Sequence, residues 1–364
     1  MGKPTVHPVI LAGGKGERFW PYSNSKHPKQ LLPLVSRQSM LEDTLDNIRG
    51  FDRKAAIRLI VSKNLEKPVK AKLRRAKGVL TVAEPVGRNT AAAVALAARL
   101  ILREDPQGVM LVLTADHAIS PPRKFSQAMQ AAVSVASQGG CLVTFGIKPD
   151  RPETGYGYIE VDGTPETSVG GLKILKAARF HEKPSAQAAR EYLESGRFFW
   201  NSGMFAFRVD TLWEHFRRNL PATAQAFESA GDLDPRKTSF AGKLKKIYRT
   251  LEDISLDYGI MEKAREIRVV VPEFEWDDIG AWSSLDRRHP ANAEGNRTLG
   301  ESLMLESTGN TCFSDEGPIF TFGVKDLLIV RHGGVTMVVD KTKAPRLKEL
   351  VKKVQSNPKW AKYL

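Results

Sequence analysis

The sequence has little cysteine and no long apolar run, and these two absences exclude several classes of protein. Two cysteines among 364 residues, Cys141 and Cys312, cannot build a disulfide framework or a zinc site of linked cysteine pairs. The first apolar run, residues 9–12, is ended at once by glycines, so it is too short for a signal-peptide core or a membrane span. We therefore expect a cytoplasmic protein with no membrane partner.

The chain is basic, but the distribution of its charge argues against nucleic-acid binding. Lysine and arginine together number 55 against 41 acidic residues, a net charge of +14, and basic proteins often neutralise phosphates. The excess is scattered, and in the tail over 341–362 lysines alternate with leucine and valine as on the wet face of an amphipathic helix. No stacking-aromatic or helix-turn-helix motif accompanies it. A small anionic substrate explains the balance better than a nucleic acid.

Short apolar runs alternate with helical patterns over the first 150 residues. Buried strands are predicted for residues 9–12, 58–61, 79–82, 109–113 and 141–145. Helices are predicted between them, including one over 89–102 with Asn89 or Thr90 as its N-cap. Continuous apolar strands separated by helices indicate a parallel sheet covered on both faces. The sequence thus predicts a doubly wound, Rossmann-like α/β fold.

The pattern changes twice further along the chain. Residues 156–161 alternate and are aromatic, as in an antiparallel strand, and 212–263 is largely helical in pattern. We expect these elements to be inserted in or appended to the first sheet. Beyond residue 296, short β runs are joined by glycine-rich turns and followed by the basic helix. We predict a catalytic domain over residues 1–295 and a small β domain over residues 296–364.

A glycine-rich turn follows the first predicted strand, with three glycines within residues 13–16. Glycines at such a turn let backbone N–H groups approach a phosphate closely. A dinucleotide fingerprint fails because Phe19 stands where its last glycine belongs, and a Walker A loop fails because no Gly-Lys-Ser/Thr closes it. Arg18 and Lys29 add positive charge beside the turn. Anion binding and a purely structural turn are both compatible with this pattern.

Seven sequence blocks, taken in order, resemble the signature of the sugar-1-phosphate nucleotidyltransferases. The blocks are Leu11-Ala12-Gly13-Gly14-x-Gly16-x-Arg18-Phe19-x-Pro21 with Pro28-Lys29-Gln30, Glu84-Pro85-x-Gly87-Arg88-Asn89-Thr90-Ala91, Ala115-Asp116-His117, Thr154-Gly155-Tyr156-Gly157-Tyr158-Ile159, Glu182-Lys183-Pro184, Trp200-Asn201-Ser202-Gly203-Met204-Phe205 and Trp276-x-Asp278-x-Gly280-x-Trp282. The resemblance implies a GT-A-like, mixed but mostly parallel sheet with flanking helices. It also implies a C-terminal domain like a short left-handed β-helix, and a homodimer that this domain supports.

The resemblance is to the branch that transfers GMP from GTP to mannose 1-phosphate, giving GDP-mannose and pyrophosphate. The attacking phosphate oxygen is already an anion near pH 7, so positioning and electrostatics should carry the reaction. Another sugar 1-phosphate, another nucleotide, or a catalytically idle regulatory paralogue are the alternatives. An idle paralogue would have lost charged positions of the signature, and this chain retains them.

Two carboxylates are the candidate Mg²⁺ ligands. Asp116 follows the strand 109–114, at the carboxyl end where open α/β sheets bind their ligands. Asp278 lies in a separate aromatic-flanked turn. Carboxylates and phosphate oxygens form the hard oxygen site that Mg²⁺ prefers, and the family holds its metal at these two positions. The family's spacing selects Asp278 over Asp277, which we expect to be a solvated neighbour.

Glu84 is the candidate for reading the base. Guanine presents an N1–H and a 2-amino group side by side, and one carboxylate can accept from both. Related enzymes place a base-reading residue here, and a carboxylate would repel the N1 acceptor of adenine. A surface role for Glu84 is the alternative. Asn89 and Thr90 would lie at a helix N-terminus, which favours an anion or a polar base edge, although capping alone would explain them.

The resemblance assigns the remaining roles position by position. The expected catalytic residues are Arg18, Lys29, Asp116 and Asp278. The expected nucleotide-binding residues are Leu11, Ala12, Gly13, Gly14, Gly16, Arg18, Glu84, Pro85, Asn89, Thr90 and Asp116. The expected sugar-phosphate-binding residues are Gly155, Glu182, Lys183 and Asn201.

Overall fold

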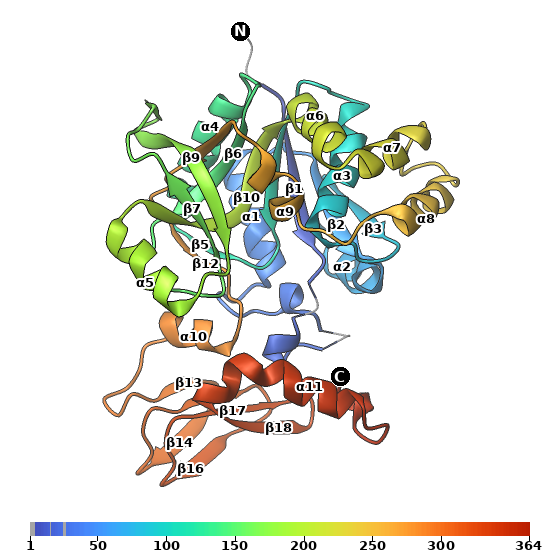
Figure 1. The fold of residues 1–364 in the computed structure, drawn as a ribbon. Helices are drawn as coiled ribbons and strands as arrows, with labels where there is room; N and C mark the ends of the chain where they lie inside the picture. The colour runs from blue at the N-terminus through green and yellow to red at the C-terminus, as the bar shows by residue number, and fades with distance from the viewer. Residues whose placement is uncertain (1–3, 15, 25–26) are drawn as a thin grey trace. The chain divides into compact units, whose positions relative to one another are not determined.

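The computed structural model describes residues 4–14, 16–24 and 27–364, which form two compact units. The first unit comprises Met1–Gly13, Thr44–Ala115 and Ile119–Trp276, and the second comprises Gly14–Asp43, Asp116–Ala118 and Asp277–Leu364. Each unit is therefore assembled from three separate stretches of the chain. Figure 1 shows the helices and strands coloured in their order along the chain. Among the described residues, no helix has both the length and the apolar character needed to cross a bilayer.

The first unit is built on a ten-stranded mixed sheet with the order β3-β2-β1-β4-β10-β6-β11-β9-β7 and β8 beside β9. Its strands are β1 (Val6–Ala12), β2 (Ile57–Ser62), β3 (Val79–Glu84), β4 (Val109–Thr114), β6 (Leu142–Ile147), β7 (Gly157–Val161), β8 (Thr167–Val169), β9 (Leu172–Glu182), β10 (Phe198–Arg208) and β11 (Ile267–Val270). Strands β9 and β10 run opposite to the others. Eight of the ten strands therefore share one direction, and the sheet is mixed, as predicted.

Strand β10 is inserted in the middle of the parallel sheet rather than added at its edge. It pairs antiparallel with β4 on one side and with β6 on the other. Its first residues also pair with β7, and the register with β6 shifts between Asn201 and Phe205. Gly203 lies within this irregularity with a φ of 67°, a conformation that glycine adopts without steric cost. Such bulges re-aim side chains, and Asn201 lies at the start of this one.

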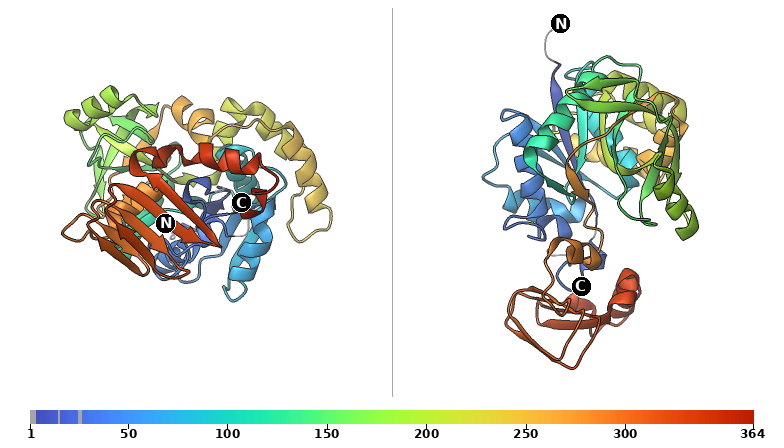
Figure 2. Two further views of the ribbon diagram at one scale, coloured as in Figure 1. Left: turned by 90° about the horizontal axis from the view of Figure 1, so that it is seen from below. Right: turned by 90° about the vertical axis from the view of Figure 1, so that its left-hand side faces the viewer.

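Helices cover both faces of this sheet. The helices are α1 (Met40–Phe51), α2 (Glu66–Lys72), α3 (Asn89–Leu102), α4 (Pro122–Ala136), α5 (Ala186–Ser195), α6 (Val209–Asn219), α7 (Pro221–Ser229), α8 (Phe240–Thr250) and α9 (Leu256–Gly259). Helix α3 packs against β1, β2 and β4, and α4 packs against β4, β6, β10 and β11. Alternate residues of β4, such as Met110 and Val112, share the core of α3. Figure 2 shows α3 and α4 on opposite sides of the sheet.

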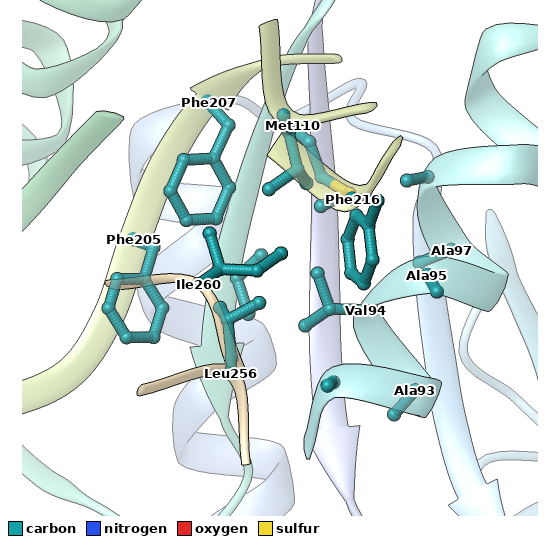
Figure 3. Packing of buried hydrophobic residues seen from close by; sticks show 14 of the residues in the cluster. Ala93, Val94, Ala95, Ala97, Met110, Phe205, Phe207, Phe216, Leu256 and Ile260 are labelled. Atoms are coloured by element: carbon teal, nitrogen blue, oxygen red, sulfur yellow. The ribbon is translucent and has the colours of Figure 1, made fainter. Parts of the chain in front are cut away.

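The core on the α3 face explains why that helix is rich in alanine. Helix α3 contacts the sheet and also α6, α7 and α9, so most of its side chains are buried. Small side chains allow the helix to approach neighbours on several sides. Figure 3 shows Ala93, Val94 and Ala97 of α3 in one cluster with Phe205 and Phe216. This core therefore joins α3 to strands β1, β3 and β4 through Val9, Val82 and Val112.

The second unit contains stacked β turns closed by a helix. Its strands are β13 (Arg297–Leu299), β14 (Ser302–Leu305), β15 (Thr311–Ser314), β16 (Ile319–Phe322), β17 (Leu327–His332) and β18 (Val335–Asp340). Strands β13, β15 and β17 stack in parallel, and β14 and β16 form a second parallel pair, as in successive turns of a β-helix. Helices α10 (Trp282–Arg288) and α11 (Leu347–Gln355) pack on a core that includes Trp282 and Val351. Lys348, Lys352 and Lys353 of α11 are exposed, as predicted.

Candidate active site

Glu84 ends strand β3 and is a buried carboxylate, 5% exposed. Its Oε1 accepts a hydrogen bond from the Tyr248 hydroxyl at 3.1 Å. Its Oε2 lies beside the glycine turn, because a methyl group added at Gly13 would be 3.9 Å from it. Burial raises the pKa of Glu84 to about 7, against the lowering effect of the Tyr248 hydrogen bond. Glu84 is therefore an interior side chain and not the surface residue of the alternative interpretation.

The start of helix α3 differs from the predicted capping. The N-cap position belongs to Arg88, and neither Asn89 nor Thr90 caps the helix from that position, so this prediction is wrong. Asn89 has a φ of 60° and accepts from the Thr90 N–H through Oδ1 at 3.0 Å. The Thr90 hydroxyl accepts from the Leu256 N–H at 2.8 Å. The reason is tertiary: the Ile254 carbonyl oxygen, in the segment before α9, accepts from the Ala91 N–H at 3.3 Å, as a local cap would have done. The predicted ligand roles of Asn89 and Thr90 stay predictions.

A second polar cluster in the first unit joins three strands around Gly157. Glu182 ends β9, and Gly157 is its register partner on β7. A methyl group added at Gly157 would lie 2.5 Å from Glu182 Oε2 and 3.5 Å from Asn201 Cβ. The missing side chain at Gly157 therefore leaves room for Glu182 and Asn201 to come together. Gly155 instead donates its N–H to the Glu153 carboxylate at 3.1 Å, so Gly157 is the glycine of this cluster.

Lys183 and Asp257 complete this cluster. The Lys183 ammonium lies 2.9 Å from Glu182 Oε1, which raises the pKa of Lys183. Lys183 has a φ of 47°, a strained conformation for a residue other than glycine that is common at functional sites. Asn201 donates to Asp257 Oδ1 at 2.7 Å. Burial raises the pKa of Asp257, as does the nearby Glu182. Sequence reasoning missed Asp257, which follows Asn201 by 56 residues.

In the second unit, Lys29 joins Asp116 to the turn that carries Asp278. Its ammonium donates to Asp116 Oδ2 at 2.8 Å and to the Asp278 carbonyl oxygen at 3.0 Å. Burial alone would raise the pKa of Asp116, but the Lys29 ammonium and His117 outweigh it and hold that pKa below its usual value. Burial lowers the pKa of His117 in turn. Asp116 is therefore an ionised carboxylate, already paired with a buried lysine.

The turn after β12 (Glu275–Asp277) orients two adjacent carboxylates differently. Asp277 is 6% exposed and accepts from Arg287 at 2.7 Å and from the Ile279 N–H at 2.9 Å. The expectation that Asp277 is solvated is therefore wrong, because this ion pair fastens it inside the unit. Asp278 accepts from the Gly280 N–H at 2.9 Å, and a methyl group at Gly280 would lie 2.7 Å from its Oδ2. A side chain at position 280 would therefore crowd the Asp278 carboxylate, which explains why glycine follows Asp278 by two residues.

A polar pocket of about 460 Å³ in the second unit is lined by the four predicted catalytic residues, Arg18, Lys29, Asp116 and Asp278. It is lined by Gly16, Glu17, Arg18, Phe19, Lys29, Asp116, His117, Asp278, Gly280 and Lys348. The Arg18 guanidinium donates to the Gly280 carbonyl oxygen at 3.5 Å. Lys348 on α11 was not anticipated from the sequence, where it resembles the other lysines of a solvated helix face. Only the fold distinguishes it from them.

The glycine turn divides between the two units. Leu11, Ala12 and Gly13 belong to the first unit, and Gly14 and Gly16 belong to the second. In the second unit, Gln30 donates to the Gly14 carbonyl oxygen at 3.0 Å. Gly16 has a φ of 65°, and a methyl group there would lie 2.6 Å from Lys29 Cβ. The conformation and the close approach together require glycine at position 16.

Comparisons with known proteins identify the family. Residues 7–294 match the nucleotidyl transferase family, and residues 300–354 match the MannoseP isomerase/GMP-like beta-helix domain. The chain belongs to the nucleotidyl transferase family. The matches confirm the fold class and the resemblance predicted from the seven blocks. The division at residues 295 and 296 stays a prediction.

Several relatives share most of the chain. The mannose-1-phosphate guanylyltransferase of Escherichia coli K12 is 34% identical over 98% of this chain and 75% of its own length. The xanthan biosynthesis protein XanB of Xanthomonas campestris is 37% identical over 96% of this chain and 73% of its own length. A crystal structure named mannose-1-phosphate geranyltransferase, from Thermus thermophilus, is 35% identical with a TM-score of 0.84, covering 96% of this chain and 99% of that one.

Proposed function

We propose that this nucleotidyltransferase transfers GMP from GTP to mannose 1-phosphate, releasing pyrophosphate and forming GDP-mannose. The observation that carries the proposal is the pocket in which Asp116, Asp278, Arg18 and Lys29 meet. Mannose-1-phosphate guanylyltransferases that are 34% to 37% identical to this chain support the choice of substrates. The reaction needs charge stabilisation more than a base, because the sugar phosphate is already an anion.

Asp116 and Asp278 fit the binding of Mg²⁺. Both carboxylates line the same pocket, and a magnesium site in proteins combines one or two carboxylates with substrate phosphates and water. Asp116 Oδ2 accepts from the Lys29 ammonium and Asp278 Oδ1 accepts from the Gly280 N–H, so both carboxylates are held in fixed orientations. When bound, Mg²⁺ would supply Lewis-acid stabilisation of the phosphate charge. Arg18 and Lys29 would hold the triphosphate and balance the charge of the departing pyrophosphate.

Glu84 would select guanine and the Gly157 cluster would bind the sugar. An ionised carboxylate accepts from two adjacent N–H donors, and Glu84 Oε2 faces Gly13 of the glycine turn. In the second cluster, Glu182 and Asn201 present an acceptor and an amide, which suit hydroxyl groups that both donate and accept. Lys183 would pair with the sugar phosphate. A carboxylate that selects guanine should make GTP a better substrate than UTP, dTTP or ATP.

A homodimer through the β-helix explains an exposed apolar face in the second unit. Leu303 and Leu305 of β14 lie opposite Phe320 and Phe322 of β16 in the ladder. These side chains are 58% to 71% exposed, and contiguous apolar patches of this kind mark interaction surfaces. Neither strand carries a charged residue, so a second copy of the same face is a better occupant than a charged partner. Light scattering of wild type and a Phe320→Asp, Phe322→Asp variant tests this, and a dimer that survives would refute it.

The activity is tested by pyrophosphate release from purified protein with Mg²⁺, mannose 1-phosphate and each of GTP, ATP, UTP and dTTP, repeated with glucose 1-phosphate. We expect selective use of GTP with mannose 1-phosphate, and its loss in Asp116→Asn and in Asp278→Asn. The exposed Glu194→Gln change is a matched control that should keep full activity. Equal use of another nucleotide or sugar would identify a different transferase. No turnover with any pair would indicate an idle paralogue.

A further inference from the structure

The Tyr248 hydroxyl is the partner of the Glu84 carboxylate, and it is supplied from a distant part of the chain. Tyr248 lies on α8, is fully buried, and donates to Glu84 Oε1 at 3.1 Å across a sequence separation of 164 residues. Arg88, four residues after Glu84, donates through Nε to the Tyr248 carbonyl oxygen at 3.2 Å. Tyr248 of α8 is therefore hydrogen-bonded both to the last residue of β3 and to the residue that precedes α3.

The Tyr248 hydroxyl has one hydrogen and two acceptors within reach. The second acceptor is the Ala92 carbonyl oxygen, at 3.4 Å from the hydroxyl. When Glu84 is ionised, the shorter and charge-assisted bond to Oε1 is favoured. When Glu84 is protonated, its own O–H can donate to the tyrosine oxygen, and the tyrosine hydrogen can turn to Ala92. The Glu84–Tyr248 pair thus has two hydrogen-bond arrangements, and the protonation state of Glu84 determines which one forms.

Glu84 changes its protonation near neutral pH, whereas Tyr248 stays neutral there. Burial raises the pKa of Glu84 to about 7. Burial and the adjacent Glu84 raise the pKa of Tyr248 well above its ordinary value, so Tyr248 stays a neutral donor. Among the described residues, Tyr248 is the one whose side chain is hydrogen-bonded to the Glu84 carboxylate. Burial raises the pKa of Glu84 and this hydrogen bond lowers it.

The two states of Glu84 suit two different bases. An ionised carboxylate only accepts hydrogen bonds, which matches the N1–H and 2-amino donors of guanine. A protonated carboxyl donates one hydrogen and accepts another, which matches the N1 acceptor and 6-amino donor of adenine. Tyr248 takes one of the roughly four lone-pair sites of the carboxylate, so both oxygens keep acceptor capacity for a base.

We propose that Tyr248 is a positioning residue for base selection, which holds Glu84 as a charged acceptor for guanine, so that the preference for GTP over ATP falls only when Glu84 is protonated in acid. This inference rests on the proposed function and adds to it a residue outside the seven sequence blocks. The Tyr248 hydroxyl stabilises the ionised form of Glu84, so its removal should move the loss of selectivity to higher pH.

The test compares wild type with Tyr248→Phe in steady-state assays with mannose 1-phosphate and GTP, ITP or ATP, between about pH 5.5 and pH 8.5. In wild type, the ratio of kcat/KM for GTP to that for ATP should fall about tenfold from the alkaline to the acid end, the effect of one charge-assisted hydrogen bond. In Tyr248→Phe, the pH at which this ratio is halfway between its alkaline and acid values should be higher than in wild type. KM for GTP should rise more than KM for ITP, which lacks the 2-amino group, while kcat is retained.

Two further variants keep the test decisive. Tyr192→Phe also removes a tyrosine hydroxyl that has a side-chain partner, His181 Nδ1 at 3.2 Å, and should leave the pH dependence of the nucleotide ratio as in wild type. Glu84→Gln mimics the protonated carboxyl at every pH, so its ratio should be low and independent of pH, even if Tyr248→Phe fails to fold. A wild-type pH profile and KM for GTP in Tyr248→Phe, or a pH-dependent ratio in Glu84→Gln, would overturn the inference. Absence of any GTP turnover in wild type would instead refute the proposed function.

Discussion

Replacing Glu84 with glutamine should stabilise the protein at alkaline pH. Burial raises the pKa of Glu84 from 4.5 to about 7 in the folded protein, whereas in the unfolded chain it keeps its ordinary value. As the pH rises through this interval the unfolded chain loses the proton first, so the folded state becomes less stable. Above both pKa values the cost is about 3 kcal/mol. Glutamine never ionises and retains an oxygen for the Tyr248 hydroxyl, so the variant avoids this cost.

Urea unfolding of wild type and Glu84→Gln at about pH 5 and about pH 8 measures this effect. The difference in unfolding free energy between the two proteins should change by about 2 kcal/mol in favour of the variant on going to the higher pH. Taking the difference cancels the other titrating groups. The exposed Glu194→Gln variant should show no such change. A difference between Glu84→Gln and wild type that does not vary with pH would refute the reasoning from burial.

Three further predictions concern the second unit. Arg287→Met leaves the buried Asp277 carboxylate without its ion pair and should lower the unfolding free energy by about 3 kcal/mol, measured by urea unfolding. Gly16→Ala should lower it by about 2 kcal/mol because of its positive φ and the contact with Lys29, with Gly87→Ala as the unhindered comparison. Lys348→Ala should raise KM for pyrophosphate in the reverse reaction about tenfold, because the pocket loses a cation.

Each of these has an outcome that contradicts it. Arg287→Met with wild-type stability would mean that Asp277 is solvated after all. Equal stability losses in the two glycine variants would remove the steric argument at Gly16. For Lys348, the arginine variant should keep a KM near that of wild type, and Lys352→Ala, on the exposed face of the same helix, should have no effect. If Lys352→Ala matches Lys348→Ala, the effect reflects the net charge of the helix and not the pocket.

Much of the fold was predictable because its signals are local. Helix α3 begins and ends at the residues that the alanine-rich pattern indicated, Asn89 and Leu102. The strand before Asp116 was equally clear, since a strand buried on both faces is an unbroken apolar run. The positions of Asp116, Asp278 and Lys29 as candidates came from short blocks of sequence. The pocket in the second unit does bring those side chains together.

What the local pattern determined is where elements lie along the chain and which short blocks carry chemistry, because apolar periodicity and turn residues act over a few positions. Tertiary structure alone decided the insertion of β10 between β4 and β6, the burial of Asp277 against Arg287 and the seating of Tyr248 on Glu84. These depend on groups that are far apart in sequence and meet only after folding, and burial then sets the pKa of Glu84. The local sequence pattern therefore predicts neither these long-range contacts nor the burial of the groups that make them.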